Sequence, residues 1–195
     1  MAPVLHDTFP LRKGRTHEVF GPGATGFAAI CAAGLQGPVI WVRESWQSDT
    51  LAPVGLSAFF DPARLLVAQA KNQIELLAVA EEALRDGAVP LVVMELSQPV
   101  ELTPGRRLQL AAKAGQATGL CIIPEGMGSN AAETRWRAAP VYDETGADST
   151  LMRWELRKNK AGTLGAWDVR WTHSAHRLDV VPPVGERPGS AAAPD

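Results

Sequence analysis

The chain has 195 residues, of which 46% are hydrophobic and 21% charged, and its formal net charge at pH 7 is −2. The composition excludes a chain that is disordered throughout, and the length predicts one domain with short appendages, because a domain takes about 150 residues. The slightly acidic balance excludes a broadly basic surface that coats nucleic acid, although a local basic patch is compatible with it. Two cysteines, Cys31 and Cys121, are too few for a disulfide framework or a four-cysteine zinc site.

The sequence shows no targeting or membrane segment. Its first ten residues lack an apolar signal core, and its longest apolar stretch, residues 27–35, is shorter than the ~20 residues that a bilayer span needs. We therefore expect a cytoplasmic protein without membrane contact, whose two cysteines are buried thiols in a reducing compartment.

The first third of the chain reads as strand, turn and helix. Residues 1–15 indicate a loosely draped lead-in, and residues 16–20 have strand character. They run into the turn-forming cluster Gly21-Pro22-Gly23-Ala24-Thr25-Gly26. A buried alanine-rich helix is predicted over residues 27–35, closed by Gly34 or Gly37. Two further strands are predicted at residues 39–42 and 64–68, an apolar run typical of a fully buried parallel strand follows at residues 91–94, and another buried strand is predicted at residues 120–123.

Two amphipathic helices are predicted between these strands. The first begins with Asn72 as its N-cap and Glu75 reaching back, and it stops at Gly87. The second has Thr103-Pro104 as its N-cap and first residue and continues to Lys113. One helical stripe of the first helix is expected along Ile74, Leu77, either Ala80 or Glu81, and Leu84.

The pattern changes after residue 126. Residues 134–141, 151–158 and 167–172 alternate apolar and polar side chains, which is typical of antiparallel strands with one solvated face. Residues 180–195, rich in proline, glycine and alanine, are predicted to be a disordered tail. The sequence thus predicts an α/β fold in one domain over residues 16–179, with a mainly parallel central sheet flanked by helices and a C-terminal antiparallel extension.

The order of strand, glycine-rich turn and helix is that of a phosphate-binding loop. Such a loop needs backbone amides, a lysine for the terminal phosphates and a hydroxyl for Mg²⁺. Phe27 stands where the lysine would be, and Ala28 stands where the hydroxyl would be. The sequence therefore favours a structural turn, with weak nucleotide or anion binding as the alternative, and predicts neither a cofactor nor a metal. Together with Phe27 and Ala28, the degenerate phosphate loop contains Gly21, Gly23, Thr25 and Gly26.

The resemblance to a known superfamily rests on several segments. Leu11-Arg12-Lys13-Gly14-Arg15-Thr16-His17-Glu18-Val19-Phe20-Gly21-Pro22 is similar to the segment leading into the Walker A loop of RecA-family recombinases, and residues 38–97 resemble that family's core. Arg157-Lys158-Asn159-Lys160-Ala161 resembles the Lys-Asn-Lys hairpin near the end of the core. Within this superfamily the chain most resembles the ImuA family, by its short length, its lost lysine and the segments at residues 61–66 and 106–111. The resemblance covers about residues 11–171, which is most of the chain expected to be ordered, and implies a RecA-like core there.

The resemblance also implies roles for single residues. Glu44 falls where the recombinases keep the glutamate that activates the hydrolytic water, and Glu95 falls at the Walker B carboxylate. Phosphoryl transfer depends on positioned charges, so both carboxylates are expected to be remnants without catalytic activity. Their alternatives are a surface residue for Glu44 and a simple polar contact for Glu95. Lys158 and Lys160 match lysines that reach the nucleotide of a neighbouring subunit, and the alternative is two solvated hairpin lysines.

The regions that bind DNA in the recombinases correspond to residues 98–103 and 126–132. The second contains neither Arg nor Lys and so gains nothing from counterion release, which predicts weak or indirect DNA contact. Together with the two hairpin lysines, Arg135, Trp136 and Arg137 are candidate interface residues. Alternatively, the two arginines lie on the solvated face of a sheet without binding a partner, and the tryptophan is a core residue.

The resemblance to the ImuA family implies a non-catalytic accessory protein of damage-induced (SOS) translesion DNA synthesis that acts by protein–protein interaction. The partners it implies are an ImuB-like polymerase subunit and, as further candidates, RecA and the error-prone C-family polymerase. Two alternatives are open at this point. One is a cell-division inhibitor similar to SulA, which also lacks a working phosphate loop, and the other is a weak ATPase with an altered loop.

Overall fold

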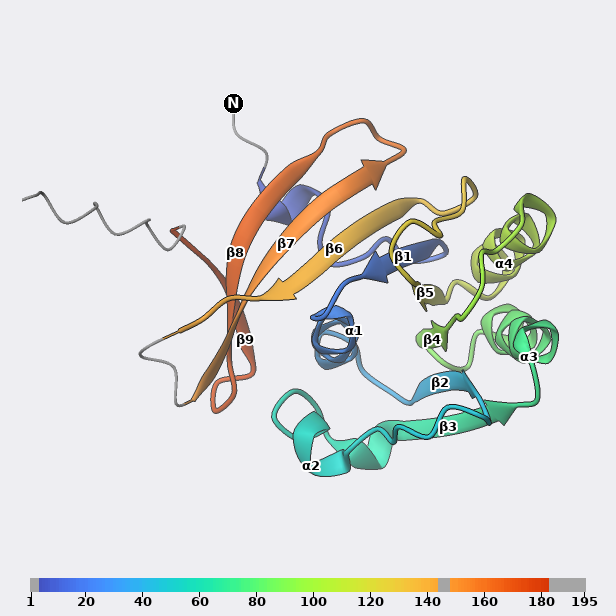
Figure 1. Ribbon diagram of the computed structural model, residues 1–195, viewed down its shortest axis with the longest axis horizontal. Coiled ribbons are helices and arrows are strands. Elements are labelled where there is room, and N and C mark those ends of the chain that lie inside the picture. Colours follow the sequence, from blue (N-terminus) through green and yellow to red (C-terminus); the bar gives the residue numbers. More distant parts are fainter. Residues whose placement is uncertain (1–3, 144–147, 183–195) are drawn as a thin grey trace, which may run out of the picture.

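The computed structural model describes residues 4–143 and 148–182, which are built around one nine-stranded sheet (Figure 1). The strands are β1 (Thr16–Phe20), β2 (Val39–Glu44), β3 (Leu65–Ala70), β4 (Leu91–Glu95), β5 (Thr118–Ile122), β6 (Thr134–Pro140), β7 (Ser149–Asn159), β8 (Gly165–Thr172) and β9 (Arg177–Val181). The helices are α1 (Ala24–Ala33), α2 (Pro53–Leu56), α3 (Gln73–Asp86) and α4 (Leu102–Gly115), with 3-10 turns at Leu5–Asp7 and Pro62–Arg64.

The strand order is β3-β2-β4-β5-β1-β6-β7-β8-β9. Neighbours from β3 to β6 are parallel, whereas the pairs from β6 to β9 are antiparallel. Strand β6 therefore joins the two parts of the sheet, because it is parallel to β1 and antiparallel to β7. The order confirms the predicted α/β fold with a mainly parallel sheet and a C-terminal antiparallel extension.

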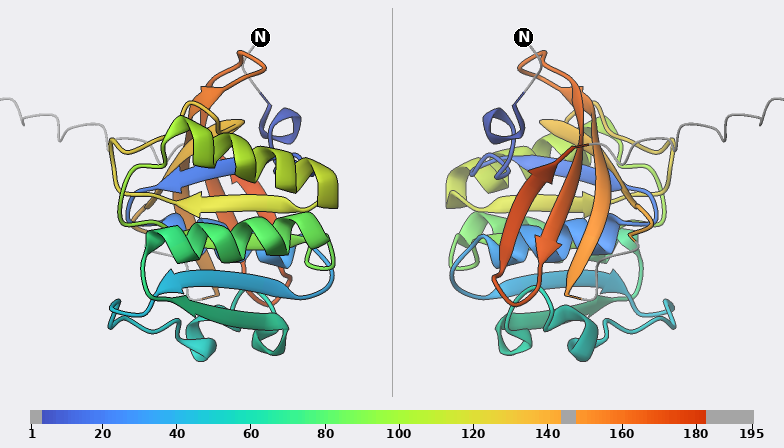
Figure 2. Two further views of the ribbon diagram at one scale, coloured as in Figure 1. Left: turned by 90° about the vertical axis from the view of Figure 1, so that its right-hand side faces the viewer. Right: turned by 90° about the vertical axis from the view of Figure 1, so that its left-hand side faces the viewer.

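Helices cover the parallel strands on both faces. Helices α3 and α4 lie side by side on one face, and the antiparallel strands curl over the other (Figure 2). Helix α1 lies between the parallel strands and this extension, in a core that includes Phe27, Trp136 and Trp154. A second core, with Leu76 and Leu84 of α3, fills the space under α3 and α4. Cys31 and Cys121 are buried free thiols, one in each core, as expected.

The predicted ends of α3 are confirmed by its capping bonds. The Glu75 amide donates to the Asn72 side chain at 3.0 Å, and the Glu75 carboxylate accepts from the Lys71 amide at 2.7 Å. Gly87 ends the helix at φ +76°, where a Cβ would lie 2.3 Å from the Gly115 carbonyl oxygen, so a larger residue would separate the ends of α3 and α4. The predicted stripe is confirmed at Ala80, Glu81 and Leu84, which are buried. It is wrong at Ile74, which is 82% exposed, while Leu76 is buried instead.

Three further features differ from the sequence-based expectations. The lead-in is packed rather than loosely draped, because Leu5 is buried and the Phe9 ring lies 5.0 Å from that of Trp154. Helix α4 begins at Leu102 after Glu101, two residues before the predicted start. Strand β9 was not predicted, and its last residues, Val180 and Val181, fall within the expected tail. The rest of that tail, residues 183–195, lies outside the described residues.

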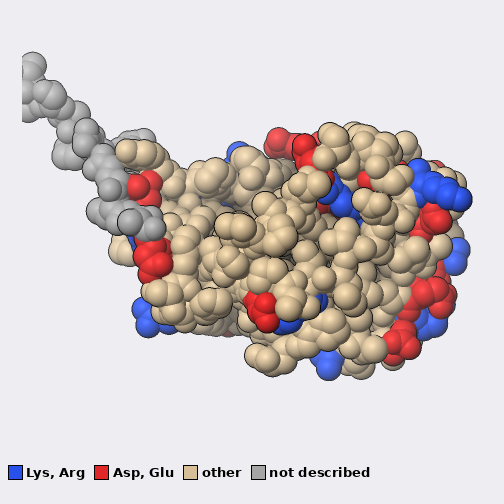
Figure 3. Space-filling view, turned by 90° about the horizontal axis from the view of Figure 1, so that it is seen from below, with Lys and Arg blue, Asp and Glu red and all other residues tan. Residues whose placement is uncertain are grey.

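The surface charge is unevenly distributed. Seen from the side of α2 and β3, Lys, Arg, Asp and Glu gather at the end occupied by α3, while the middle of the view holds few charged residues (Figure 3). Edge strand β3 contributes Leu66 and Val67, each about half exposed. In the described parts of the chain, no helix combines the length and the apolar character that crossing a bilayer demands.

Candidate functional site

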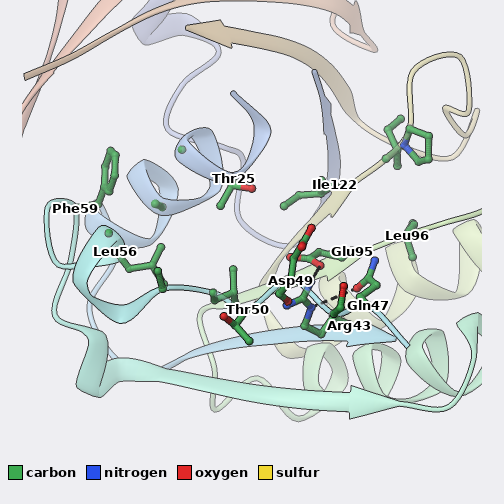
Figure 4. Close-up of a pocket in the computed structure, with 18 of the residues that line it drawn as sticks. Thr25, Arg43, Gln47, Asp49, Thr50, Leu56, Phe59, Glu95, Leu96 and Ile122 are labelled. Atoms are coloured by element: carbon green, nitrogen blue, oxygen red, sulfur yellow. Dashed lines mark hydrogen bonds and ion pairs between the residues drawn. The ribbon is translucent and has the colours of Figure 1, made fainter. Parts of the chain in front are cut away.

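A cleft of about 770 Å³ opens at the carboxyl ends of β2, β4 and β5, beside the first turn of α1 (Figure 4). Open α/β sheets bind their ligands at this position, because loops diverge there and leave a crevice. The polar part of the wall comes from Thr25 of α1, Arg43 of β2, Glu95 of β4 and the segment after β2. The apolar part comes from Leu51, Leu56, Phe59, Leu96, Ile122 and Ile123.

The glycine turn before α1 packs against the backbone of β6. The Gly23 amide donates to the Ala138 carbonyl at 2.9 Å, and a Cβ on Gly21, which has φ +96°, would lie 2.6 Å from the same oxygen. The Ala24 and Phe27 amides donate to Gly21 and Gly23 carbonyls. Two amides of the turn, those of Gly23 and Ala24, are thus bonded within the protein, and a phosphate cradle there would first have to break those bonds.

Phe27 and Ala28, where a phosphate loop has its lysine and hydroxyl, both face the core. Neither side chain is exposed, and neither lines the cleft. The Phe27 ring lies 4.5 Å from Trp154 and 5.6 Å from Trp136, measured between ring centroids. The structure therefore places Phe27 inside an aromatic cluster and both side chains in the core rather than at the cleft.

Glu95 is held by two donors of β2. Its Oε1 accepts from Trp41 Nε1 at 2.7 Å, and its Oε2 lies 2.9 Å from Arg43 Nη2. Glu44 accepts from Ser97 Oγ at 2.6 Å, is buried, and does not line the cleft. Successive residues of a strand face opposite sides of the sheet, so Arg43 and Glu44 point apart. The structure therefore does not bring Glu44 and Glu95 together in the cleft.

The charges in the cleft wall leave a net negative balance. Arg43 bonds Glu95, the Gln47 side chain and the Asp49 carbonyl, and only 9% of its side chain is exposed. The wall holds Arg43 as its one cation against the carboxylates of Glu95 and Asp49, so its formal charge is −1. Among the described residues the Asp49 carboxylate has no hydrogen-bond or ion-pair partner. A triphosphate would meet a wall of its own sign here.

Lys158 and Lys160 bind their own chain. Lys158 Nζ donates to the Ser129 and Asn130 carbonyls at 3.0 Å each, and Lys160 Nζ donates to the Ala131 carbonyl at 2.7 Å. Burial, with the Arg135 guanidinium nearby as a further cause, lowers the pKa of the Lys158 ammonium. The two lysines bond to carbonyls of the segment before β6, while Lys160 stays exposed and Lys158 is half-buried.

The three candidate interface residues of β6 have different environments. Trp136 is completely buried, and its Nε1 donates to Thr134 Oγ1 at 2.9 Å, so it is a core residue and the interface prediction for it is wrong. Arg135 Nε lies 2.7 Å from Glu18 Oε2, a carboxylate that is only 2% exposed. Arg137 pairs with Glu155 at 3.2 Å and keeps about a third of its side chain exposed.

Sequence reasoning missed the segment of residues 45–52, which supplies most of the polar wall of the cleft. It contains Trp46, which is 64% exposed, together with Gln47 and Asp49. These residues match no motif, but a tryptophan within a polar stretch directly after a buried strand is a signal for an exposed aromatic side chain.

The nine-stranded mixed sheet, the covering helices and the cleft at the carboxyl ends of the parallel strands define an open-sheet α/β protein with an antiparallel extension. No protein-family model matches the chain. It is 31% identical, over 205 aligned positions, to Protein ImuA of Caulobacter vibrioides strain NA1000 / CB15N, with 89% of this chain and 83% of that protein covered. The match to Protein ImuA of strain ATCC 19089 / CIP 103742 / CB 15 has the same values. The chain belongs to the ImuA family.

Proposed function

We propose that this protein is a non-catalytic accessory factor of damage-induced translesion DNA synthesis, and that it acts in the cytoplasm by binding other proteins. An ImuB-like polymerase subunit is the proposed main partner, with RecA and the error-prone C-family polymerase as further candidates. Membership of the ImuA family supports the assignment to the damage response.

One observation carries the non-catalytic part of the proposal, namely the filled glycine turn. The Gly23 amide already donates to the Ala138 carbonyl and is not free to bind a phosphate. Phe27, at the position of the phosphate-binding lysine, packs in the core against Trp154. An ATPase needs a cation and a metal-binding hydroxyl at the phosphates, because positioned charge supplies most of the rate of phosphoryl transfer. The net negative wall of the cleft supports the same reading.

The binding part of the proposal is tested by co-expression with the ImuB-like subunit of the same organism. We expect the two proteins to co-purify on a tag carried by either one and to co-elute in size-exclusion chromatography. Separate elution, together with an empty pull-down in both directions, contradicts the proposed partnership.

The non-catalytic part is tested in cells and by calorimetry. Glu44→Gln removes the carboxylate that an ATPase would need, while its amide oxygen can still accept from Ser97. We expect this variant to restore damage-induced mutagenesis to a strain lacking the gene, and we expect no Mg²⁺-dependent heat at millimolar ATP. Measurable ATP hydrolysis that Glu95→Gln abolishes would favour the weak ATPase. Filamentous cells on overexpression, with unchanged mutation frequency, would favour the division inhibitor.

A further inference from the structure

We infer that the cleft is a docking site for a cationic side chain, an arginine or lysine within an extended apolar segment of a partner protein. The inference rests on the proposed function, since it names the chemistry by which this accessory protein would hold a partner. Three observations on the described residues carry it, all in one cleft of about 770 Å³. They are the unpaired carboxylate of Asp49, the exposed ring of Trp46 and the apolar part of the wall.

The charge that is left over in the cleft is negative. Arg43 does not offer a cation to a ligand, because its guanidinium is already bonded to Glu95, Gln47 and the Asp49 carbonyl. Glu95 is bonded in turn by Arg43 and Trp41. The carboxylate of Asp49 lines the cleft and is exposed, and no described group pairs with it. A ligand that complements this wall therefore carries a positive charge.

Trp46 adds a surface that suits the same ligand. It is 64% exposed and lines the same cleft as Asp49, three residues further along the chain. The face of an indole ring attracts guanidinium and ammonium groups, and tryptophans are enriched among the residues that dominate protein interfaces. A folded protein gains nothing from holding a large ring in water, so a partner that covers Trp46 gains its burial.

The shape of the cleft favours a polypeptide over a free ion. Its volume lies within the range of sites that hold ligands of several hundred daltons, which is more room than one side chain fills. Leu51, Leu56 and Phe59 form an apolar part of the wall. The close-up shows Leu56 and Phe59 at the other end of the cleft from Glu95 (Figure 4). An apolar neighbour of the cationic residue can pack there, so the peptide would contact both the polar and the apolar part of the wall.

The first turn of α1 is the one feature that would also suit an anion. The amides of Thr25 and Gly26 belong to a helix start, where backbone donors lack intrahelical partners. The same donors can bind the carbonyl oxygens of a peptide backbone. Because the wall is net negative and the Gly23 amide is already bonded, the peptide is the ligand that the observations favour, and an anion is an outcome of the test.

The test uses the full chain and four libraries of acetylated, amidated heptapeptides with randomised apolar flanks and a fixed central Arg, Lys, Gln or Glu. We expect the Arg and Lys libraries to bind in calorimetry at least tenfold more tightly than the Gln library, with an affinity that falls as salt rises. Asp49→Asn and Trp46→Ala should each weaken that binding about tenfold. The matched controls are Glu101→Gln, an exposed carboxylate outside the cleft, and Tyr142→Ala, an aromatic residue 82% exposed.

Equal binding of the Arg and Gln libraries, or unchanged binding by both cleft variants, overturns the inference. Competition by inorganic phosphate or ATP also overturns it and identifies an anion site. The partner assay separates this result from the proposed function. If the ImuB-like subunit co-purifies equally with wild type and Asp49→Asn, the docking inference fails while the accessory role stands. If the subunit never co-purifies, the proposed partnership fails, and the libraries still decide the chemistry of the cleft.

Discussion

The rings of Phe27 and Trp154 lie with their centroids 4.5 Å apart and their planes at 56°, at the point where α1 meets the antiparallel extension. Phe9 of the lead-in touches both rings, at 5.9 Å and 5.0 Å. Three segments that are far apart in sequence therefore meet on one side chain. Phe27 stabilises the fold at the position where a phosphate loop would have its lysine.

Replacing Phe27 by lysine should destabilise the protein strongly. Truncating a buried Phe costs about 3–5 kcal/mol, and a buried ammonium adds a further penalty, so we expect Phe27→Lys to lower the free energy of unfolding by about 4 kcal/mol or more. The measurement is urea-induced unfolding. Thr25→Lys places the same charge in the same turn at an exposed position and should cost less than about 1 kcal/mol. Equal stability of the two variants would show that the ring is not part of the core.

The pair between Glu18 and Arg135 should contribute to stability as a buried ion pair does. Glu18 is 2% exposed and also accepts from the Ser129 amide at 2.7 Å, so a glutamine there can keep one of the two bonds but leaves the Arg135 guanidinium without its carboxylate. We expect Glu18→Gln to reduce the free energy of unfolding by about 3 kcal/mol. Glu155→Gln, which affects more exposed pairs with Arg137 and Arg157, should cost under about 1 kcal/mol. Similar costs for both variants would contradict the burial argument.

Removing Lys160 should loosen the segment before β6. Its ammonium is bonded to the Ala131 carbonyl, and losing this contact should cost about 1 kcal/mol. We expect Lys160→Ala to speed amide hydrogen exchange in residues 129–133 while other segments exchange as in wild type. Lys113→Ala, which removes an exposed lysine of α4, is the control. Unchanged exchange in residues 129–133 would mean that the lysine does not hold this segment.

His17 should make the protein less stable at acid pH. Burial lowers its pKa from 6.5 to about 4, so between these values the unfolded chain binds a proton that the folded chain does not. Stability is therefore greatest above pH 6.5 and falls as the pH drops toward 4, by up to about 3 kcal/mol. His17 Nε2 donates to the Arg12 carbonyl at 3.0 Å, so Nδ1 accepts from Thr134 in the neutral ring.

The check is urea unfolding at several pH values between 4.5 and 7.5, on wild type and on His17→Gln. The variant lacks the titrating ring, so the slope of its unfolding free energy against pH should be smaller in this window, whatever its absolute stability. Parallel slopes would show that His17 does not cause the pH dependence.

Most of the fold could be predicted from local signals. Strand β1 has the predicted bounds. The caps of α3 at Asn72 and Gly87 could also be predicted, because capping depends only on residues close to each end of the helix. Strand β9 was missed because it is an edge strand in which no residue is fully buried, so its sequence lacks the alternation that burial imposes. The packed lead-in was missed because Leu5 and Phe9 are single apolar residues without a local pattern, and Phe9 packs on Phe27 of α1 and on Trp154, which lies more than a hundred positions away.

The site was harder to predict, since its interactions join distant segments. The loss of a lysine and a hydroxyl at Phe27 and Ala28 could be read directly from the sequence. That Lys160 bonds to residue 131, and that Arg135 pairs with Glu18, depends on how β1, β6 and the β7–β8 hairpin come together. Alternation along β6 places Arg135 and Arg137 on one face, but it does not say what covers each of them.

The distribution of tryptophans allows the cleft to be followed by the intrinsic fluorescence of the protein. Five of the six, Trp41, Trp136, Trp154, Trp167 and Trp171, are at most 8% exposed, whereas Trp46 is 64% exposed at the cleft. Water shifts indole emission to longer wavelength, so red-edge excitation of the unlabelled protein selects Trp46. The centroids of Trp136, Trp154 and Trp167 are spaced at about 6 Å, close enough for energy to pass between them, so their blue emission serves as an internal reference that responds to folding rather than to the cleft.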